Sequence, residues 1–203
     1  MKREALREKW LNPQGVYGLF PCQAEGDDLI IYNPENLDEV LTRFTFPRQP
    51  HDEHLCLADY YASGESGQMD VVAFQVVTVG QEATGRFDRL QSAHDYTEAY
   101  FTHGLAVQAA EATADFLHEY LRREMGIPES QGKRYSWGYP AIPELEDHKK
   151  VIELLPAVVT ELGMSLSPAY QLIPEQSTAA IIVHHSQAKY YSVGESRVEQ
   201  LMR

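Results

Sequence analysis

The chain has 203 residues, of which 43% are hydrophobic and 10% aromatic, an ordinary composition for a globular protein. Its net charge of −13 argues against a general surface for nucleic acid or for anionic membranes. The charged N-terminus is not a signal peptide, and no stretch stays apolar over the roughly 18 residues that a membrane-spanning helix needs. These features predict a cytoplasmic protein with one domain over residues 1–203, and with neither a nucleic-acid nor a membrane partner.

Neither the cysteines nor the histidines are spaced like a metal site. Cys22 and Cys56 could form one disulfide, but two reduced thiols are the default in the cytoplasm. His184 and His185 are adjacent on an expected strand, where side chains point to opposite faces and cannot readily share one metal ion. The glycine-rich phosphate loops and the nucleophile elbow of hydrolases are missing as well. The sequence therefore offers no metal ligand and no catalytic residue.

Periodicity, prolines and glycines predict a mixture of helices and strands. In chain order we expect a helix over residues 1–10, strands over 15–20, 29–32 and 41–46, a buried strand over 70–79, helices over 81–90, 94–125 and 144–155, strands over 169–173, 178–184 and 189–193, and a helix over 195–202. A turn at Gly26-Asp27-Asp28 joins the first two strands into a hairpin. Strands early and late, with long helices between them, indicate an α+β fold with an antiparallel sheet.

The helix expected over residues 94–125 carries two stripes of side chains. One stripe is apolar and recurs every three or four residues: Leu105, Ala109, Ala112, Phe116 and Tyr120. Its alanines are small enough for another element to pack closely against the helix. The other consists of acids four residues apart: Glu111, Asp115 and Glu119. Such acids most often form a solvated face, and the alternative is that one of them points into a ligand groove.

The segment 134–143 reads Arg-Tyr-Ser-Trp-Gly-Tyr-Pro-Ala-Ile-Pro. Its prolines push the residues before them towards extended geometry, and Gly138 lets the backbone approach another group closely. The segment cannot be a helix and makes a poor central strand, so we interpret it as a rigid loop that holds one cation and several flat rings. A ligand with an anionic end, a flat base and a cationic centre suits it. S-adenosylmethionine has all three, and the alternative is a surface turn with incidental aromatics.

A second segment of interest is Lys189-Tyr190-Tyr191, within the last expected strand. Adjacent strand residues point to opposite faces, so one ring is expected in the core and the other at a groove. An exposed tyrosine ring attracts a sulfonium by cation–π interaction. The alternative is an edge strand with ordinary amphipathic tyrosines.

These residues resemble a known family, the C-terminal adenosylmethionine-binding reactivation domain of cobalamin-dependent methionine synthase. The family signature is an Arg, three residues and then Gly-Tyr-Pro-Ala-Cys-Pro, which stands here as residues 134–143. Further blocks follow in the family's order over nearly the whole chain: Trp10 with Gly15-Val16-Tyr17-Gly18, Gly26-Asp27-Asp28, Leu57-Ala58-Asp59, Ala110-Glu111-Ala112 with Leu117-His118-Glu119, and residues 186–193.

The resemblance implies a C-shaped single domain, in which helices flank a twisted antiparallel sheet beside one long central helix. It also implies a shallow groove for S-adenosylmethionine, where a guanidinium holds the methionine carboxylate in a fixed fork. Carried onto this chain, seven residues belong to that groove: Arg134 at the carboxylate, Tyr135, Gly138 and Tyr139 framing the groove, Glu111 near the sulfonium and amino group, and Tyr190 and Tyr191 along the wall.

The chemistry implied by the resemblance is rescue of an oxidised cofactor. Cobalamin, held by another domain or chain, receives an electron from flavodoxin or a similar reductase and then takes the methyl group of S-adenosylmethionine as cob(I)alamin. The cobalt does the nucleophilic work and the protein supplies positioning. Because flavodoxins are acidic, docking is expected at a local basic cluster. Lys149-Lys150 and Arg122-Arg123 are the candidates.

The chain departs from the family pattern in three places. Ile142 stands where the family has Cys, and Leu145 replaces its usual His. The family's upstream Tyr-x-Asp-Trp segment precedes the point where this chain begins, so we expect either a domain fragment or a short form without that ligand contact. The cobalamin-binding Asp-x-His-x-x-Gly motif is missing. Two alternatives stay open: a non-catalytic adenosylmethionine sensor or docking module, and a stand-alone partner that reactivates a separately encoded cobalamin enzyme.

Overall fold

The computed structural model describes residue 5, residues 7–51 and residues 53–194. They fall into two compact units. The first unit contains Met1–Gly18, Phe74–Leu121 and Leu145–Ala180, and the second contains Leu19–Ala73, Arg122–Glu144 and Ile181–Arg203. Of the helix expected over residues 1–10, the described residues Ala5, Arg7 and Glu8 are helical. The helix expected over residues 195–202 lies outside the described residues.

A six-stranded sheet carries the fold, with the strand order β3-β2-β1-β4-β8-β5. Its strands are β1 (Gln14–Glu25), β2 (Asp28–Asn33), β3 (Asn36–Thr45), β4 (Asp70–Thr78), β5 (Lys133–Ser136) and β8 (Ser177–Val183). The pairs β1–β2 and β2–β3 are antiparallel, and the turn at residues 26–27 joins β1 to β2 as predicted. A separate antiparallel pair consists of β6 (Ser165–Leu166) and β7 (Leu172–Ile173). The α+β class with an antiparallel sheet is confirmed.

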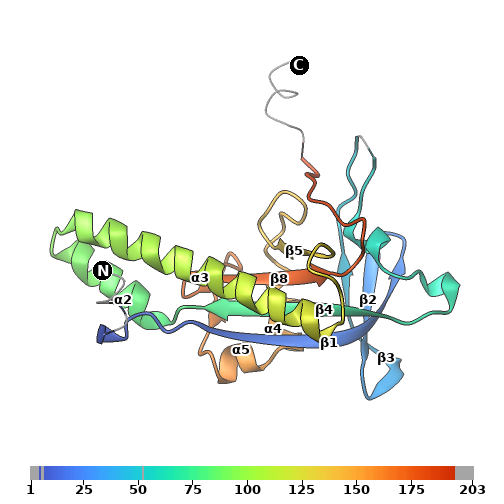
Figure 1. Cartoon of the computed structure of the whole chain (residues 1–203), viewed down its shortest axis with the longest axis horizontal. Helices are drawn as coiled ribbons and strands as arrows, with labels where there is room; N and C mark the ends of the chain where they lie inside the picture. Colours follow the sequence, from blue (N-terminus) through green and yellow to red (C-terminus); the bar gives the residue numbers. More distant parts are fainter. Residues whose placement is uncertain (1–4, 6, 52, 195–203) are drawn as a thin grey trace. The chain divides into compact units, whose positions relative to one another are not determined.

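Four α-helices accompany these strands among the described residues: α2 (Gln81–Ser92), α3 (Tyr96–Glu124), α4 (His148–Leu154) and α5 (Ala157–Thr160). Two 3-10 helices, η1 (Leu57–Tyr60) and η2 (Gly64–Ser66), precede β4. The long helix α3 is the green-to-yellow coil of Figure 1. It begins where the Asp95 carboxylate accepts the backbone N–H of Glu98 at 3.2 Å. It ends before Gly126, whose φ of 69° is the left-handed conformation of a helix C-cap.

The buried face of α3 is built mainly from small side chains, so the helix comes close to the strands of the first unit. These residues are Ala99, Thr102, Ala106, Ala110, Ala114 and Leu121. On β4, the buried Gln75 donates its Nε2 to the carbonyl of Ala114 at 3.1 Å. On β1, a Cβ added to Gly15 would lie 3.0 Å from the side chains of both Leu117 and Val77. The absence of a side chain at Gly15 therefore permits this close approach.

The apolar stripe predicted from sequence is only partly buried: Leu105 and Ala109 pack against a core cluster, but the most buried face of α3 is a neighbouring one. Phe116 is 68% exposed and Tyr120 is 45% exposed, whereas Ala106 and Ala114 are almost completely buried. Both stripes recur at spacings of three and four, and periodicity alone does not rank them. The larger side chains lie outside because the close backbone approach leaves room for alanine and little more.

Further elements differ from the prediction. The strand expected over residues 169–173 is shortened to β7, Leu172–Ile173. Residues 133–136, expected to be loop, form the edge strand β5; the prolines come later, and an edge position tolerates the irregular residues that follow. Residues 189–193 were expected to be a strand but pair with no other strand in the described sheet. The Lys189 carbonyl accepts a tyrosine hydroxyl and the Val193 N–H donates to a loop carbonyl, so these backbone groups are not available to a neighbouring strand. The helix expected over residues 144–155 begins only at His148.

An ion pair links the start of β4 to the end of β8 in the second unit. His184 Nε2 lies 2.7 Å from Asp70 Oδ1, and Asp70 Oδ2 accepts the backbone N–H of Ala62 at 2.8 Å. The hydrogen bond to Asp70 raises the pKa of His184 against the opposing effect of burial. Burial disfavours the charged form of Asp70, but the hydrogen bonds from His184 and the backbone outweigh it, and the pKa of Asp70 lies below its usual value.

We expect Gly132→Ala to destabilise the fold and to disturb β5. Gly132 has a φ of 83°, and an added Cβ would lie 2.9 Å from the backbone oxygen of Val183 on β8. Strain and overlap together should lower the free energy of unfolding in urea by about 2–4 kcal/mol. Gly26→Ala is the matched control, since Gly26 has a φ of 61° and open space around it, and should cost only about 1 kcal/mol. Equal costs at the two positions would contradict the steric explanation.

Asp70→Asn should reduce stability most strongly in mildly acidic solution. Because the pKa of His184 is raised in the folded protein, the stability that this residue contributes is complete at pH values below the usual pKa of histidine. That stability is lost as the pH rises through the pKa of His184 in the folded protein. The lowered pKa of Asp70 means that its contribution is complete above its usual pKa and is lost as pH falls. The difference between wild type and variant, about 1–2 kcal/mol, should therefore peak between about pH 4 and 6.5. Unfolding in urea at several pH values measures it, and exposed Asp38→Asn should show no such peak.

Candidate functional site

The loop that follows β5 is held in one shape by its own backbone. Gly138 donates its N–H to the carbonyl of Ile142 at 2.9 Å, and Ile142 donates to the carbonyl of Tyr139 at 3.0 Å. Gly138 has a φ of 85°, which a residue with a Cβ adopts only with strain. The loop places Tyr139 in solvent, 58% exposed. The rigid loop expected from the prolines is therefore present from residue 137 onwards.

Aromatic and aliphatic packing fixes this loop to the core of the second unit. Trp137 is buried, and its ring lies 5.8 Å from that of Phe44 on β3. Ala141 and Ile142 are also buried. Ile142, which stands where the resembling family has Cys, thus fills an apolar position in the core. On the adjacent strand β5, Arg134 is partly exposed.

The strap, residues 187–193, lies against β5 and its loop. Tyr135 on β5 donates its hydroxyl to the carbonyl of Lys189 at 2.6 Å. Val193 donates its N–H to the carbonyl of Pro140 at 3.0 Å. Lys189 Nζ contacts both carboxylate oxygens of Glu53, at 2.5 and 2.6 Å. Two segments about fifty residues apart in the sequence are therefore joined, and with them six of the seven candidate residues lie in the second unit: Arg134, Tyr135, Gly138, Tyr139, Tyr190 and Tyr191.

The two strap tyrosines do not point to opposite faces as predicted. The rings of both Tyr190 and Tyr191 lie against Tyr135, with centroid distances of 5.4 and 6.3 Å. The alternation argument fails because the strap is not a strand. The tyrosines still differ in surroundings: Tyr190 is 67% exposed, whereas Tyr191 is partly buried and burial raises its pKa. Tyr190 can therefore offer a ring face to a ligand, and Tyr191 supports the strap from within.

Glu111, the seventh candidate, lies on α3 in the first unit and is partly exposed. The acids Asp115 and Glu119 follow on the same helix. Among the described residues, no group of three or more His, Cys, Asp or Glu could hold a metal ion. Cys22 and Cys56 are both free and buried, and burial raises the pKa of each thiol, to about 11 for Cys56. Neither is therefore a reactive thiolate at neutral pH.

A hollow of about 370 Å³ opens beside the strap. Its lining combines an ion pair, an aromatic ring and an amide: Glu53, Leu55, Tyr60, Gln187 and Lys189. None of these residues was predicted as a ligand contact. The sequence signals near them were the block Leu57-Ala58-Asp59, which forms the 3-10 helix η1 that ends at Tyr60, and the block 186–193, which contains Gln187 and Lys189.

A larger hollow, of about 680 Å³, lies in the first unit. The exposed stripe of α3 and the segment 11–15 form it: Ala5, Leu11, Pro13, Gln14, Gly15, Leu105, Gln108, Ala109, Ala112, Thr113, Phe116 and Leu117. Among the residues that the structure describes, no charged side chain lines it. A ligand with a carboxylate and two cationic centres would lose solvation there without gaining a charged partner. The charged and aromatic residues of the second unit suit such a ligand better, although their hollow is smaller.

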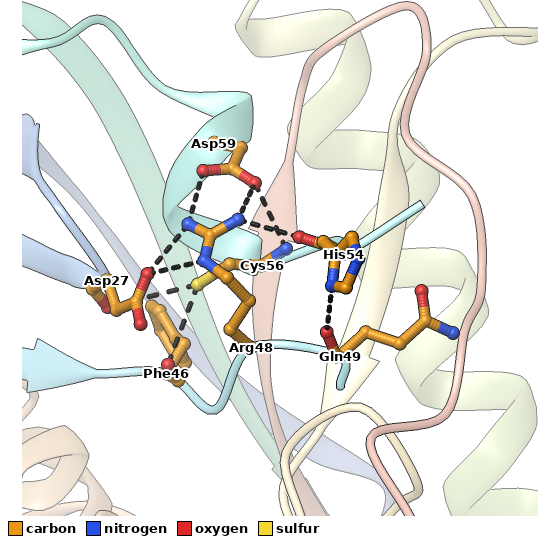
Figure 2. A network of polar contacts seen from close by, with 7 residues as sticks. All are labelled: Asp27, Phe46, Arg48, Gln49, His54, Cys56 and Asp59. Carbon is orange, nitrogen blue, oxygen red and sulfur yellow. Dashed lines mark hydrogen bonds and ion pairs between the residues drawn. The ribbon is translucent and has the colours of Figure 1, made fainter. Parts of the chain in front are cut away.

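Arg48 is the centre of the polar network in Figure 2 and lies at the start of the loop that, further along the sequence, contains Glu53. Its guanidinium contacts Asp27 at the β1–β2 turn and both carboxylate oxygens of Asp59, the latter at 2.7 Å each. It also donates to the carbonyl of His54 at 2.7 Å. The hydrogen bonds from Arg48 keep the pKa of Asp59 below its usual value. Arg48, at the start of the loop, is thus joined to His54 and Asp59 at its other end.

Comparison with known proteins gives consistent results. The model of the family described as "Vitamin B12 dependent methionine synthase, activation domain" matches residues 1–203. The methionine synthase of Mycobacterium tuberculosis (strain ATCC 25618 / H37Rv) is 37% identical over 202 residues, covering 88% of this chain and 17% of that protein. That of Mycobacterium leprae (strain TN) is 36% identical over 202 residues, with the same coverage. The chain thus spans about a sixth of the length of these relatives.

A crystal structure of the MetH reactivation domain bound to AdoHcy is similar in fold, with a TM-score of 0.88 and 32% identity. The likeness covers 96% of this chain and 65% of that one. In the described part of the chain, no helix is long and apolar enough to cross a membrane. With its full length matched by the family model, this chain belongs to the activation-domain family of vitamin B12-dependent methionine synthase.

Proposed function

We propose that residues 1–203 act as one reactivation domain, which binds S-adenosylmethionine and presents its methyl group to a cobalamin held by another domain or chain of a cytoplasmic methionine synthase. The observation that carries the proposal is the likeness to a reactivation domain with AdoHcy bound. AdoHcy is what remains of S-adenosylmethionine after methyl transfer, so a site for one accommodates most of the other. The second unit supplies support of its own, because it brings the loop after β5 and the strap together.

The groups in the second unit match the ends of this ligand. Arg134 carries a planar guanidinium that pairs with a carboxylate through two parallel hydrogen bonds. Tyr139 and Tyr190 are exposed aromatic rings, suited to a flat base and to a sulfonium. Gly138 donates its N–H to the carbonyl of Ile142, so its role is to shape the backbone beside the ligand and not to bind the ligand directly. Glu111 supplies a negative charge for the ligand's amino group.

The chain's own contribution to methyl transfer is positioning. The cobalt supplies the nucleophile when the cobalamin domain is present, and a flavodoxin or similar reductase supplies the electron. Holding the methyl donor in one orientation lowers the entropic part of the barrier. For docking to an acidic reductase, Lys149 and Arg123 are exposed, whereas Lys150 and Arg122 are partly buried. Lys149 and Arg123 are therefore the better candidates in each pair.

Arg134→Ala should weaken S-adenosylmethionine binding by about 2–4 kcal/mol, because it removes the cation that pairs with the carboxylate. Arg134→Lys keeps the charge but loses the planar fork, so its affinity should fall between those of wild type and Arg134→Ala. Isothermal titration calorimetry measures all three.

Arg43→Ala is the matched control, because it removes the same positive charge from another position in the same unit. Arg43 lies on β3, pairs with Glu25 and Asp28 and belongs to the second unit. Its loss should leave the affinity unchanged. Equal weakening by Arg43→Ala and Arg134→Ala would show a general electrostatic effect, and unchanged affinity in Arg134→Ala would remove Arg134 from the site.

The chain alone should produce no methionine from S-adenosylmethionine and homocysteine, because the proposed methyl acceptor is the cobalt. The measurement is methionine formation by the isolated chain without any corrinoid, and then methylcobalamin formation with a cobalamin domain and a reductant. Activity only in the second mixture supports the proposal. Steady turnover in the first would indicate a direct methyltransferase, and tight binding with no transfer in either would indicate a sensor.

A further inference from the structure

Tyr135 was predicted as a ligand contact, but its surroundings give it a different part. Only 3% of the residue is exposed, and burial raises the pKa of its hydroxyl. The hydroxyl proton is already donated to the carbonyl of Lys189 at 2.6 Å. A buried phenol whose proton is already donated cannot also donate a hydrogen bond to a ligand, and its ring is covered from a ligand in a groove. What it does contact is the strap.

The ring of Tyr135 contacts the two strap tyrosines as well. Tyr190 packs edge-to-face on it, with an interplanar angle of 65°, and Tyr191 lies tilted at 57°. Such pairs contribute about 0.5–1.5 kcal/mol each beyond the area they bury. One side chain thus fixes the backbone of the strap at residue 189 and the rings of the next two residues. Removing the hydroxyl and removing the ring are separable changes.

The other ties of the strap are weaker or lie at its end. The Glu53–Lys189 ion pair is exposed, with 63% and 49% of the two side chains in solvent. Exposed ion pairs contribute about 0–1 kcal/mol and weaken in salt. The bond from Val193 to Pro140 joins the end of the strap to the loop after β5. Between these points, Tyr135 reaches the strap from the edge strand β5 with both its hydroxyl and its ring, whereas Lys133 on the same strand brings only its ammonium, 6.0 Å from the centre of the Tyr190 ring.

We propose that Tyr135 is a positioning residue: its hydroxyl and ring hold the strap, residues 187–193, so that the exposed ring of Tyr190 faces the ligand. This inference rests on the proposed function, since it assumes that the ligand sits beside the strap. Tyr135 itself does not touch the ligand. The loss of its hydroxyl therefore acts on binding only through the strap.

The test compares Tyr135→Phe with wild type in the full chain, by two measurements. Hydrogen–deuterium exchange reports the strap directly, with the hydrogen-bonded amides of Ala188 and Val193 as probes. Calorimetry reports the affinity for S-adenosylmethionine. We expect exchange in residues 187–193 to quicken and affinity to fall, each about 3–10-fold, as for one lost hydrogen bond. Glu53→Gln should quicken exchange less, and its effect should vanish in high salt.

Tyr61→Phe is the matched control. Tyr61 is also buried in the second unit and also donates its hydroxyl to a backbone carbonyl, that of Ile182 on β8, at 3.2 Å. It should leave strap exchange and affinity unchanged, which separates the proposal from general destabilisation.

Each remaining outcome decides a different point. Unchanged strap exchange in Tyr135→Phe would overturn the proposal, and so would weaker binding without a looser strap, because it would indicate direct ligand contact. If wild type bound no S-adenosylmethionine, the proposed function would fail while the exchange data still tested whether Tyr135 holds the strap.

Discussion

The hydrogen bond from the Tyr135 hydroxyl to the Lys189 carbonyl joins the parts of the second unit on which the candidate site depends. The loop after β5 and the strap are both irregular backbone, outside any ladder of strand hydrogen bonds. Buried polar groups of irregular segments must find individual partners, and each partner then determines where the segment lies. A side chain on the last strand of the sheet meets this requirement, because β5 has an edge with no neighbouring strand in the described sheet.

Regular elements could be predicted from the sequence because their signals are local. The run of apolar residues at 70–79 predicted β4, Gly26 predicted the hairpin turn, and Gly126 predicted the end of α3, and the structure contains all three. The strap could not be predicted, because Tyr and Val favour strands wherever a partner edge is available, and the sequence does not show whether one is. β5 was missed for the opposite reason: four residues before a Pro-rich loop look like part of that loop, and the pairing with β8 is a long-range contact.

The segments 134–143 and 189–191 could be predicted from the residue types themselves, and the resemblance supplied Glu111 and the part assigned to each residue. The structure now separates these residues by their burial and contacts. Arg134, Tyr139 and Tyr190 lie where solvent or a ligand can reach them, whereas Tyr135 is buried and Tyr191 is partly buried. A motif records which residues occur together and does not distinguish a ligand contact from the side chain that holds it in place. Burial and hydrogen-bond partners make that distinction. They also identify Glu53 and Tyr60 as neighbours of the strap, which no motif had indicated.

Charge within the second unit bears on how such a ligand is oriented, against an overall net charge of −13. Lys133 and Arg134 are adjacent on β5, and the ammonium of Lys133 lies 6.0 Å from the centre of the Tyr190 ring. These two cations favour the carboxylate end of the ligand and oppose the sulfonium. A sulfonium at Tyr190 has to share the negative face of that ring with Lys133. For the proposed ligand, the ring alone is therefore a weak cation site.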